Sequence, residues 1–284
     1  MNIGIIGLGL MGASFGKAFK KIGHTVYGYD TNRETMLKSG LVGAADAPLA
    51  DATFGKLDVL IIALNPRAFY GAAKNNAPKL RDGAIVLDIG GNKRAVVADM
   101  LKLHAEFPGL NFIATHPMAG REFVGINHST PAIFENASAL MIPVNASIQS
   151  AALVKKLFSD IGFFRVLPSD PETHDRIIAY TSQLCHILSS AYVASPTAEY
   201  HDGYSAGSFR DLTRVAKMNP KMWTELTVDN RGSLIVELDR LIGRLGEFRS
   251  ALTSGDEAAL EALFTEGNER KAVIEKNTRE WKKN

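Results

Sequence analysis

Three glycines near the start of the sequence, with an aspartate after them, form the pattern best suited to chemistry. Gly7, Gly9 and Gly12 have the GxGxxG spacing and follow a short apolar run at residues 3–6. Glycines in such a turn let the backbone approach a pyrophosphate, whose charge is favoured by the N–H groups that begin the next helix. A second apolar run ends at Asp30, where a carboxylate can bind both ribose hydroxyls of a dinucleotide and would repel a 2′-phosphate. The pattern therefore predicts NAD as the cofactor, bound by Gly7, Leu8, Gly9, Leu10, Met11, Gly12 and Asp30.

Further candidate residues follow the later apolar runs of the first half. In an open α/β sheet the ligand lies beyond the carboxyl ends of the strands, so these positions should face the same cleft. His116 comes directly after the run at 111–114, beside a proline and a glycine turn, and we expect it to act as an acid or base. The residues expected to line the nicotinamide side of the cleft are Asn65, Pro66, Gly90 and Gly91.

The second half adds two clusters at helical spacing. Ser182 and His186 lie four residues apart and should share a helix face, although a satisfied core histidine is an equal alternative. Arg210, Arg214 and Lys217 should share another face, which could bind a carboxylate with Asp211 orienting one arginine, or could simply be solvated.

The elements that must position these residues divide the chain into two domains. Residues 1–167 alternate strands with helices, which predicts an α/β dinucleotide-binding domain with a Rossmann-type, doubly wound, mostly parallel sheet. Its strands are expected at 3–6, 24–29, 42–45, 56–64, 84–89, 111–114, 139–144 and 163–167. Residues 168–284 show almost no strand pattern and predict an all-helical C-terminal domain, beginning with an S-x-x-E capping box at Ser169. An apolar stripe over residues 234–252 predicts a long helix, followed by a last helix at about 256–281.

Composition narrows the class of protein. The 284 residues include 32 basic and 30 acidic ones without a basic run, which argues against a nucleic-acid or membrane-surface partner. No apolar run reaches the ~18 residues that a membrane span needs. The single cysteine, Cys185, excludes an internal disulfide and fits a reducing compartment, and the first residues lack a signal-peptide layout. We therefore expect a cytoplasmic protein.

Three longer motifs carry a resemblance that extends over essentially the whole chain. HPMAG at 116–120, SFRDLTRVA at 208–216 and NPKMW at 219–223 resemble the prephenate/arogenate (cyclohexadienyl) dehydrogenase family of tyrosine biosynthesis. The resemblance implies NAD-dependent oxidative decarboxylation of prephenate to 4-hydroxyphenylpyruvate without a metal, in a homodimer built on the C-terminal helices. It implies that His116 hydrogen-bonds the ring hydroxyl of the substrate and that Arg214 binds its side-chain carboxylate. The other substrate-binding residues that it suggests are His186, Arg210, Glu122, Trp223 and Ser182.

Four positions depart from the family pattern and bear on ring-side selectivity and tyrosine feedback. Gly91 stands where many members have a serine, Gln183 and Cys185 replace a histidine and a proline, and Val124 replaces a serine. Three other functions stay open: an arogenate dehydrogenase that forms tyrosine directly, a β-hydroxyacid dehydrogenase, and a non-catalytic nucleotide-binding protein. The G-x-x-x-K-x-x-N segment expected of a β-hydroxyacid dehydrogenase is not found between residues 168 and 223.

Overall fold

The computed structural model describes residues 1–121 and 123–283, and for 278–283 it describes the backbone alone. It contains two compact units, Met1–Arg231 and Gly232–Asn284. Within the described part of the chain, no helix combines the length and the apolar character that crossing a membrane requires.

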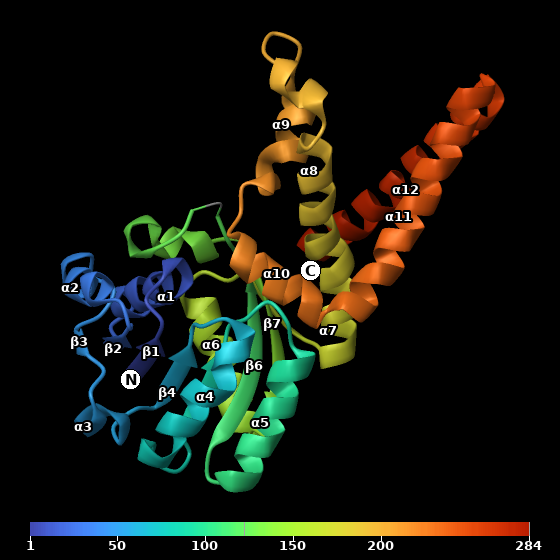
Figure 1. The fold of residues 1–284 in the computed structure, drawn as a ribbon. Helices are drawn as coiled ribbons and strands as arrows, with labels where there is room; N and C mark the ends of the chain where they lie inside the picture. Colours follow the sequence, from blue (N-terminus) through green and yellow to red (C-terminus); the bar gives the residue numbers. More distant parts are fainter. Residues whose placement is uncertain (122, 284) are drawn as a thin grey trace. The chain divides into compact units, whose positions relative to one another are not determined.

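The first unit is built on one eight-stranded sheet with the order β3-β2-β1-β4-β5-β6-β7-β8 (Figure 1). Neighbouring strands are parallel except β6 and β7, which are antiparallel. The predicted mostly parallel, Rossmann-type sheet is therefore confirmed. The strands are β1 Asn2–Ile6, β2 Thr25–Tyr29, β3 Ala47–Pro48, β4 Val59–Ile62, β5 Ile85–Asp88, β6 Asn111–Met118, β7 Ser138–Val144 and β8 Arg165–Pro168.

Both faces of the central strands are buried, which explains their continuous apolar sequences. Alternate side chains of β4 enter different clusters: Val59 and Ile61 pack with Phe15 on one face, while Leu60 and Ile62 pack with Phe69 on the other. Phe15 belongs to α1 and Phe69 to α4, so helices cover the sheet on both sides, as a doubly wound fold requires. The helices of this part are α1 Leu10–Lys21, α2 Arg33–Leu41, α3 Asp51–Phe54, α4 Pro66–Asn76, α5 Arg94–Glu106 and α6 Ile148–Asp160.

One predicted strand, at residues 42–45, is wrong. The backbone N–H of Val42 donates to Lys38, and those of Ala44 and Ala45 donate to Ser39, so these groups close the end of α2. The donors that a strand would use are therefore taken by the carbonyls of the preceding helix. Pairing with β2 starts only at Ala47.

Beyond β8 the described residues form no further strand, which confirms the helical second part. The expected cap at Ser169 is displaced by one residue: the side chain of Asp170 accepts the N–H of Thr173 at 2.8 Å, and Pro171 begins the helix. The helical elements that follow β8 in the first unit are α7 Pro171–Ile178, the π-helical turn η4 Ala179–Leu184, α8 Cys185–Val193, η5 Pro196–Tyr200, α9 Gly207–Thr213, η6 Arg214–Ala216 and α10 Pro220–Asp229.

The second unit consists essentially of the two long helices α11 Arg231–Ser254 and α12 Glu257–Lys283, as the stripe predicted. The rings of Phe248 and Phe264 lie 5.2 Å apart, and Arg244 pairs with Glu266. The stripe is only partly covered within the chain, since Leu245 and Leu252 remain 53% and 66% exposed.

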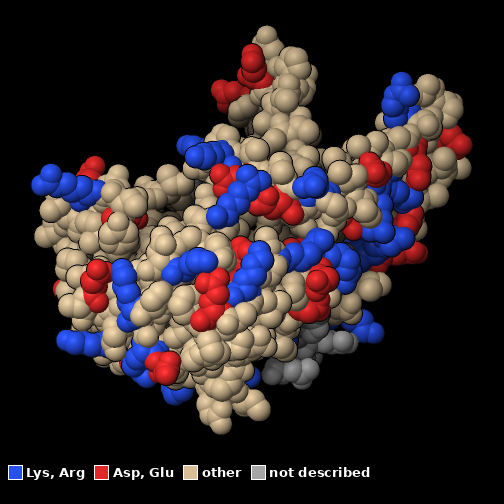
Figure 2. Space-filling model, turned by 60° about the horizontal axis from the view of Figure 1, so that its bottom comes forward, with Lys and Arg blue, Asp and Glu red and all other residues tan. Residues whose placement is uncertain are grey.

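The surface of the molecule carries both signs of charge: Lys and Arg are interspersed with Asp and Glu over the face shown in Figure 2.

Candidate active site

Of the three glycines in the loop, the fold requires two and does not require the third. Gly7 has φ +92°, and a Cβ at Gly12 would lie 1.9 Å from the carbonyl oxygen of Gly7. A Cβ at Gly9 would meet nothing within 4 Å. Folding therefore explains Gly7 and Gly12, whereas Gly9 borders open space at the N-terminus of α1, where unpaired N–H groups favour an anion.

Asp30 lies directly beside this loop. One carboxylate oxygen accepts the backbone N–H of Leu8 at 2.8 Å, and the other accepts that of Asn32 at 2.8 Å. These two bonds fix the carboxylate against the turn. Each oxygen keeps a lone pair that a ribose hydroxyl could use.

The next strand ends meet a helix from the second half of the first unit. Pro66 begins α4, and its ring would touch a Cβ at Gly90 at 3.1 Å. On the other side, a Cβ at Gly91 would lie 3.2 Å from the side chain of Leu226 in α10. Pro66 thus lies against Gly90 and Leu226 against Gly91, and Leu226 leaves little room for a side chain at Gly91.

One ion pair and one further hydrogen bond attach α10 to the nucleotide-binding part. Arg67 in α4 binds both carboxylate oxygens of Asp229, with its closest contact at 2.6 Å. Asn65 donates to Glu225 at 3.4 Å. Bidentate arginine–carboxylate pairs fix orientation as well as distance, so α10 is held in register over the strand ends.

A buried ion pair supports the end of β5. The ammonium of Lys93 lies 2.5 Å from the carboxylate of Asp88, and the two side chains are 1% and 2% exposed. The same carboxylate accepts the N–H groups of Gly90 at 2.8 Å and Thr115 at 3.0 Å. Burial lowers the pKa of Lys93, and the charge of Asp88 opposes that shift. The pair ties the turn after β5 to the adjacent strand β6.

His116 lies inside β6 and not after it, which corrects the expected strand end at residue 114. The pairing of β6 with β5 stops at Ala114, but pairing with the antiparallel β7 continues, with His116 opposite Leu140. β6 therefore projects beyond the carboxyl edge of the parallel sheet. His116 is only half-buried at this edge.

His116 contacts two residues that the sequence did not single out. Its Nδ1 lies 2.8 Å from Nε2 of His174, and Nδ1 of His174 lies 2.7 Å from a carboxylate oxygen of Asp175. Both partners come from α7 and are almost fully buried. A His-Asp pair one turn into a helix is a weak signal, because only the packed structure shows which strand it faces.

The charge on Asp175 is fixed by several donors. Its carboxylate accepts the backbone N–H groups of Lys93 at 2.8 Å and Arg94 at 3.0 Å, and also the guanidinium of Arg94 at 3.2 Å. Burial raises the pKa of Asp175, but the hydrogen bonds from His174, Lys93 and Arg94 outweigh it and leave that pKa below its usual value. Asp175 is therefore ionised at neutral pH.

The pKa values of the two imidazoles, those of His116 and His174, are also lowered, which for a histidine favours the neutral form. Burial lowers the pKa of His116 well below its usual value, and the positive charge of Lys93 adds to the shift. Burial also lowers the pKa of His174, against the hydrogen bond to Asp175 that raises it. Both rings are consequently neutral near pH 7.

A second polar group extends from Asp175 into the helices. Asn230 donates to the carbonyl of Asp175 at 2.7 Å and to the side chain of Gln183 at 2.8 Å. Gln183 in turn donates to Asn92 at 3.0 Å and to the carbonyl of Leu226 at 3.2 Å. Gln183, one of the four departures from the pattern, is thus a buried bridge between η4, α10 and the turn after β5.

The expected substrate-binding residues fall into several places. His186 stacks on Trp223 with ring centroids 3.5 Å apart, and its Nδ1 lies 2.9 Å from the backbone carbonyl of Ser182 rather than from the hydroxyl. Arg214 lies in η6, which packs against α8, the helix that carries His186. Glu122 lies outside the described residues.

The predicted helical face of basic residues is wrong. α9 ends at Thr213 and a short 3₁₀ turn ends at Ala216, after which Lys217 has extended backbone. Arg210 is 80% exposed and lies 3.6 Å from Asp211. The three cations therefore do not form one continuous stripe.

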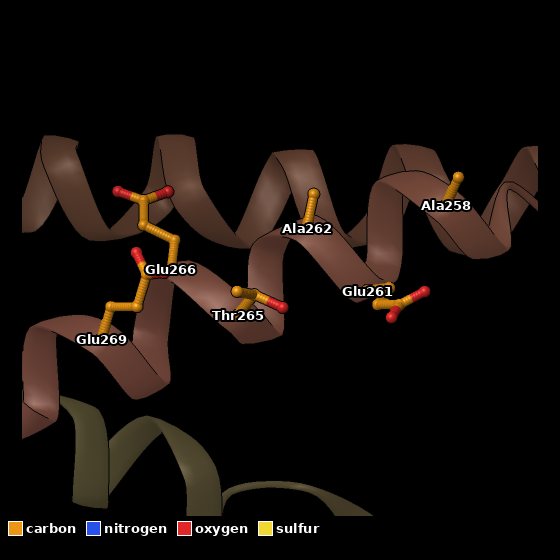
Figure 3. A pocket seen from close by; sticks show the side chains of 6 residues that line it. All are labelled: Ala258, Glu261, Ala262, Thr265, Glu266 and Glu269. Carbon is orange, nitrogen blue, oxygen red and sulfur yellow. The ribbon is translucent and has the colours of Figure 1, made fainter.

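The second unit has a hollow on α12. It is lined by Ala258, Glu261, Ala262, Thr265, Glu266 and Glu269 (Figure 3). Glu266 is already paired with Arg270 at 2.8 Å. Its lining offers carboxylates and small side chains and none of the residues singled out above.

Comparison with known proteins identifies the family. The model described as "Prephenate dehydrogenase, nucleotide-binding domain" matches residues 15–165, and the one described as "Prephenate dehydrogenase, dimerization domain" matches residues 170–266. Cyclohexadienyl dehydrogenase of Zymomonas mobilis is 28% identical over 284 residues, with 96% of each chain covered. Prephenate dehydrogenase of Lactococcus lactis is 29% identical, covering 95% of this chain and 77% of that protein. The structure of prephenate dehydrogenase from A. aeolicus in complex with hydroxyphenyl propionate and NAD+ is 26% identical with a TM-score of 0.83, covering 96% of this chain and 98% of that one. The chain belongs to the prephenate dehydrogenase family.

Proposed function

We propose that this chain is an NAD-dependent dehydrogenase that oxidises and decarboxylates prephenate to 4-hydroxyphenylpyruvate, a step of tyrosine biosynthesis. The observation that carries the proposal is a half-buried, neutral histidine, His116, on the part of β6 that projects beyond β5. A neutral imidazole at the carboxyl edge of a dinucleotide-binding sheet is suited to accept a proton while a hydride leaves.

The glycine loop fits NAD on an observation of its own. Gly9 borders space that a Cβ would enter, and the carboxylate of Asp30 is fixed beside it by the N–H of Leu8. We propose that the loop residues hold the pyrophosphate and that Asp30 holds the ribose hydroxyls, with Asn65, Pro66, Gly90 and Gly91 on the nicotinamide side. NAD, when bound, supplies the acceptor for the hydride from C4 of the substrate ring.

The residues of the chain itself would then accept and return the proton. His116 accepts the proton of the C4 hydroxyl, and it returns a proton to that oxygen once the ring carboxylate has left as carbon dioxide and the ring is aromatic. We propose that Pro66 and Leu226, which lie against Gly90 and Gly91, narrow this side of the cleft. No metal ligand takes part in these steps.

We propose that Arg214 anchors the side-chain carboxylate of the substrate. A guanidinium binds a carboxylate in a bidentate manner, and the segment of Arg214, η6, packs on α8, the helix that carries His186. We assign His186, Trp223, Ser182, Arg210 and Glu122 to the same substrate-binding region. Arogenate, whose side chain is an amino acid, stays the alternative substrate, and one relative carries the broader name cyclohexadienyl dehydrogenase.

A turnover assay tests the proposal. Purified protein is given NAD with prephenate or with arogenate, NADH formation is followed, and the product is identified as 4-hydroxyphenylpyruvate or tyrosine. Turnover of prephenate supports the proposal, and turnover of arogenate alone moves the assignment to the alternative. Absence of NADH with both substrates would contradict it.

We further propose that residues 168–284 form a substrate-binding and dimerisation domain and that the protein is a cytoplasmic homodimer. The support for a dimer is the description of the family model over residues 170–266 and the apolar side chains that α11 leaves exposed, namely Ile235, Val236, Ile242, Leu245 and Leu252. Such side chains commonly become buried in an oligomer. Light scattering at micromolar concentration tests the state, and a monomer would refute it.

A further inference from the structure

Three side chains form a row that ends at the open edge of the sheet: Asp175, His174 and His116. The distances along the row are 2.7 Å and 2.8 Å, within hydrogen-bonding range at both steps. Asp175 and His174 stand on α7, and His116 stands on the projecting part of β6 (Figure 1). The row links the helical half of the first unit to the residue that we propose as the base.

The direction of each hydrogen bond follows from the buried end. The carboxylate of Asp175 receives two backbone N–H groups and the guanidinium of Arg94, and an ionised carboxylate can only accept. Nδ1 of His174 must therefore carry a proton and donate it to Asp175. A neutral His174 then has an unprotonated Nε2, which can only accept from its neighbour.

We propose that His174 and Asp175 are positioning residues that fix His116 in the tautomer with its proton on Nδ1, which leaves Nε2 as the free acceptor for the substrate hydroxyl. This inference rests on the proposed function for the identity of the proton donor, but the tautomer is a property of the protein alone. Without the row, either nitrogen of His116 could carry the proton, and half of the possible states would present a donor where a base is needed.

The surrounding charges do not compete for His116. The carboxylate of Asp88, at the end of β5, already receives Lys93, Gly90 and Thr115. Lys93 and Arg94 supply two positive charges at the start of α5, and Asp88 and Asp175 supply two negative ones. The four charges balance without a proton on either imidazole, and burial lowers the pKa of both rings.

Among the described residues, His174 is the one side chain that hydrogen-bonds an imidazole nitrogen of His116.

Nitrogen NMR of the full-length protein tests the tautomer directly. The chain has seven histidines, and in protein labelled with ¹⁵N-histidine the signals of His116 are those that disappear in His116→Asn. At pH 7 without substrate we expect His116 to show a protonated Nδ1 and an unprotonated Nε2. A proton on Nε2 in the unaltered protein would overturn the proposal, whether or not any variant folds.

Two variants extend the test. Asp175→Asn presents an amide that can donate to His174, which reverses both bonds of the row and should place the proton of His116 on Nε2, with kcat lowered about 10²–10⁴-fold and KM little changed. His174→Phe keeps a ring without nitrogens and should give His116 a mixture of tautomers. Asp99→Asn on α5 makes the same chemical change at a surface pair with Lys102 and should alter neither the tautomer nor kcat.

The outcomes separate this proposal from the proposed function. The expected tautomer without turnover of prephenate or arogenate would leave the row standing and refute the function. Turnover by a protein whose His116 carries its proton on Nε2 would support the function and refute the role of His174 and Asp175 in fixing the tautomer. The same conclusion would follow if Asp175→Asn did not change the tautomer of His116.

Discussion

The Gly9→Ala substitution gives the sharpest test of the cofactor site. A Cβ at Gly9 meets nothing within 4 Å, and the residue has φ −68°, which alanine adopts without strain. Loss of glycine at a helix N-cap and reduced entropy of the unfolded chain are opposing effects of about 0.5–1 kcal/mol each. Stability should therefore stay within about 1 kcal/mol, or about 4 °C in Tm.

The effect on NAD should be much larger than the effect on folding. A methyl group forced between the loop and a pyrophosphate is an overpacking of about 1–3 kcal/mol, which corresponds to a Kd for NAD raised about 5- to 150-fold. Calorimetric titration with NAD measures it. An unchanged Kd in a well-folded Gly9→Ala protein would refute the placement of the pyrophosphate.

Gly12→Ala serves as the contrasting variant in the same motif. Its Cβ would lie 1.9 Å from the carbonyl of Gly7, so the loop or α1 must shift. We expect a loss of at least about 1–3 kcal/mol in the free energy of unfolding. If both variants behaved alike in Tm and in Kd, the distinction between a folding glycine and a ligand glycine would be wrong.

Five further outcomes follow from the site. Asp30 should make kcat/KM higher with NAD than with NADP, and equal values would contradict its role. His116→Asn should lower kcat about 10²–10⁴-fold with little change in KM, whereas Arg214→Gln should raise KM with kcat nearly kept, because its charge pairing is the same in ground and transition states. Since burial lowers the pKa of His116, kcat/KM should be lost as pH falls through a value below the ordinary ~6.5 and stay high above it; a midpoint above that value would argue against His116. Lys93→Met should lower the free energy of unfolding in urea by about 3–5 kcal/mol, because Asp88 would remain buried without its countercharge.

The parts of the fold that sequence could predict are those set by local patterns. The first strand, the glycine turn, α1, β2 and Asp30 occur in the expected order, because each is fixed by apolar runs and turn residues that are neighbours in the chain. The continuous run of β4 likewise marks a strand buried on both faces. The local sequence pattern predicts a strand or helix correctly where contacts with distant segments do not change where that element begins or ends.

The errors arose where a distant partner sets the outcome. β6 runs to Met118 because β7, some twenty residues later, pairs with it in the opposite direction. Residues 42–45 are apolar enough for a strand, yet their N–H groups complete the end of α2. The prediction that Arg210, Arg214 and Lys217 share one helix face is wrong for a similar reason. The helix α9 ends at Thr213, and the next turn, η6, packs on α8.

His174 and Asp175 show what sequence reasoning lacks most. Neither has a spacing to His116 that a motif could capture, because 58 positions separate the two histidines. Their importance comes from the face that α7 turns toward β6, which only packing determines. The displaced cap at Asp170 mattered here as well, because it sets where the first turn of that helix begins.

The completeness of the polar network explains why so many charges are buried at this edge. Within the described residues, only His104 Nδ1 and Ser189 Oγ are buried side-chain atoms without a hydrogen-bond partner, and neither belongs to the network. A partly satisfied network would be destabilising, because each unpaired buried group loses its hydration without compensation. A buried ion pair such as Lys93–Asp88 is weak evidence for stability, so its value is better sought in orientation. It fixes the turn after β5 against β6, while Asp175 fixes the start of α5 against α7. These two anchors fix β6, which carries His116, and α7, which carries His174, to the segment between β5 and α5, and the proton transfer that we propose would need a base on such a fixed support.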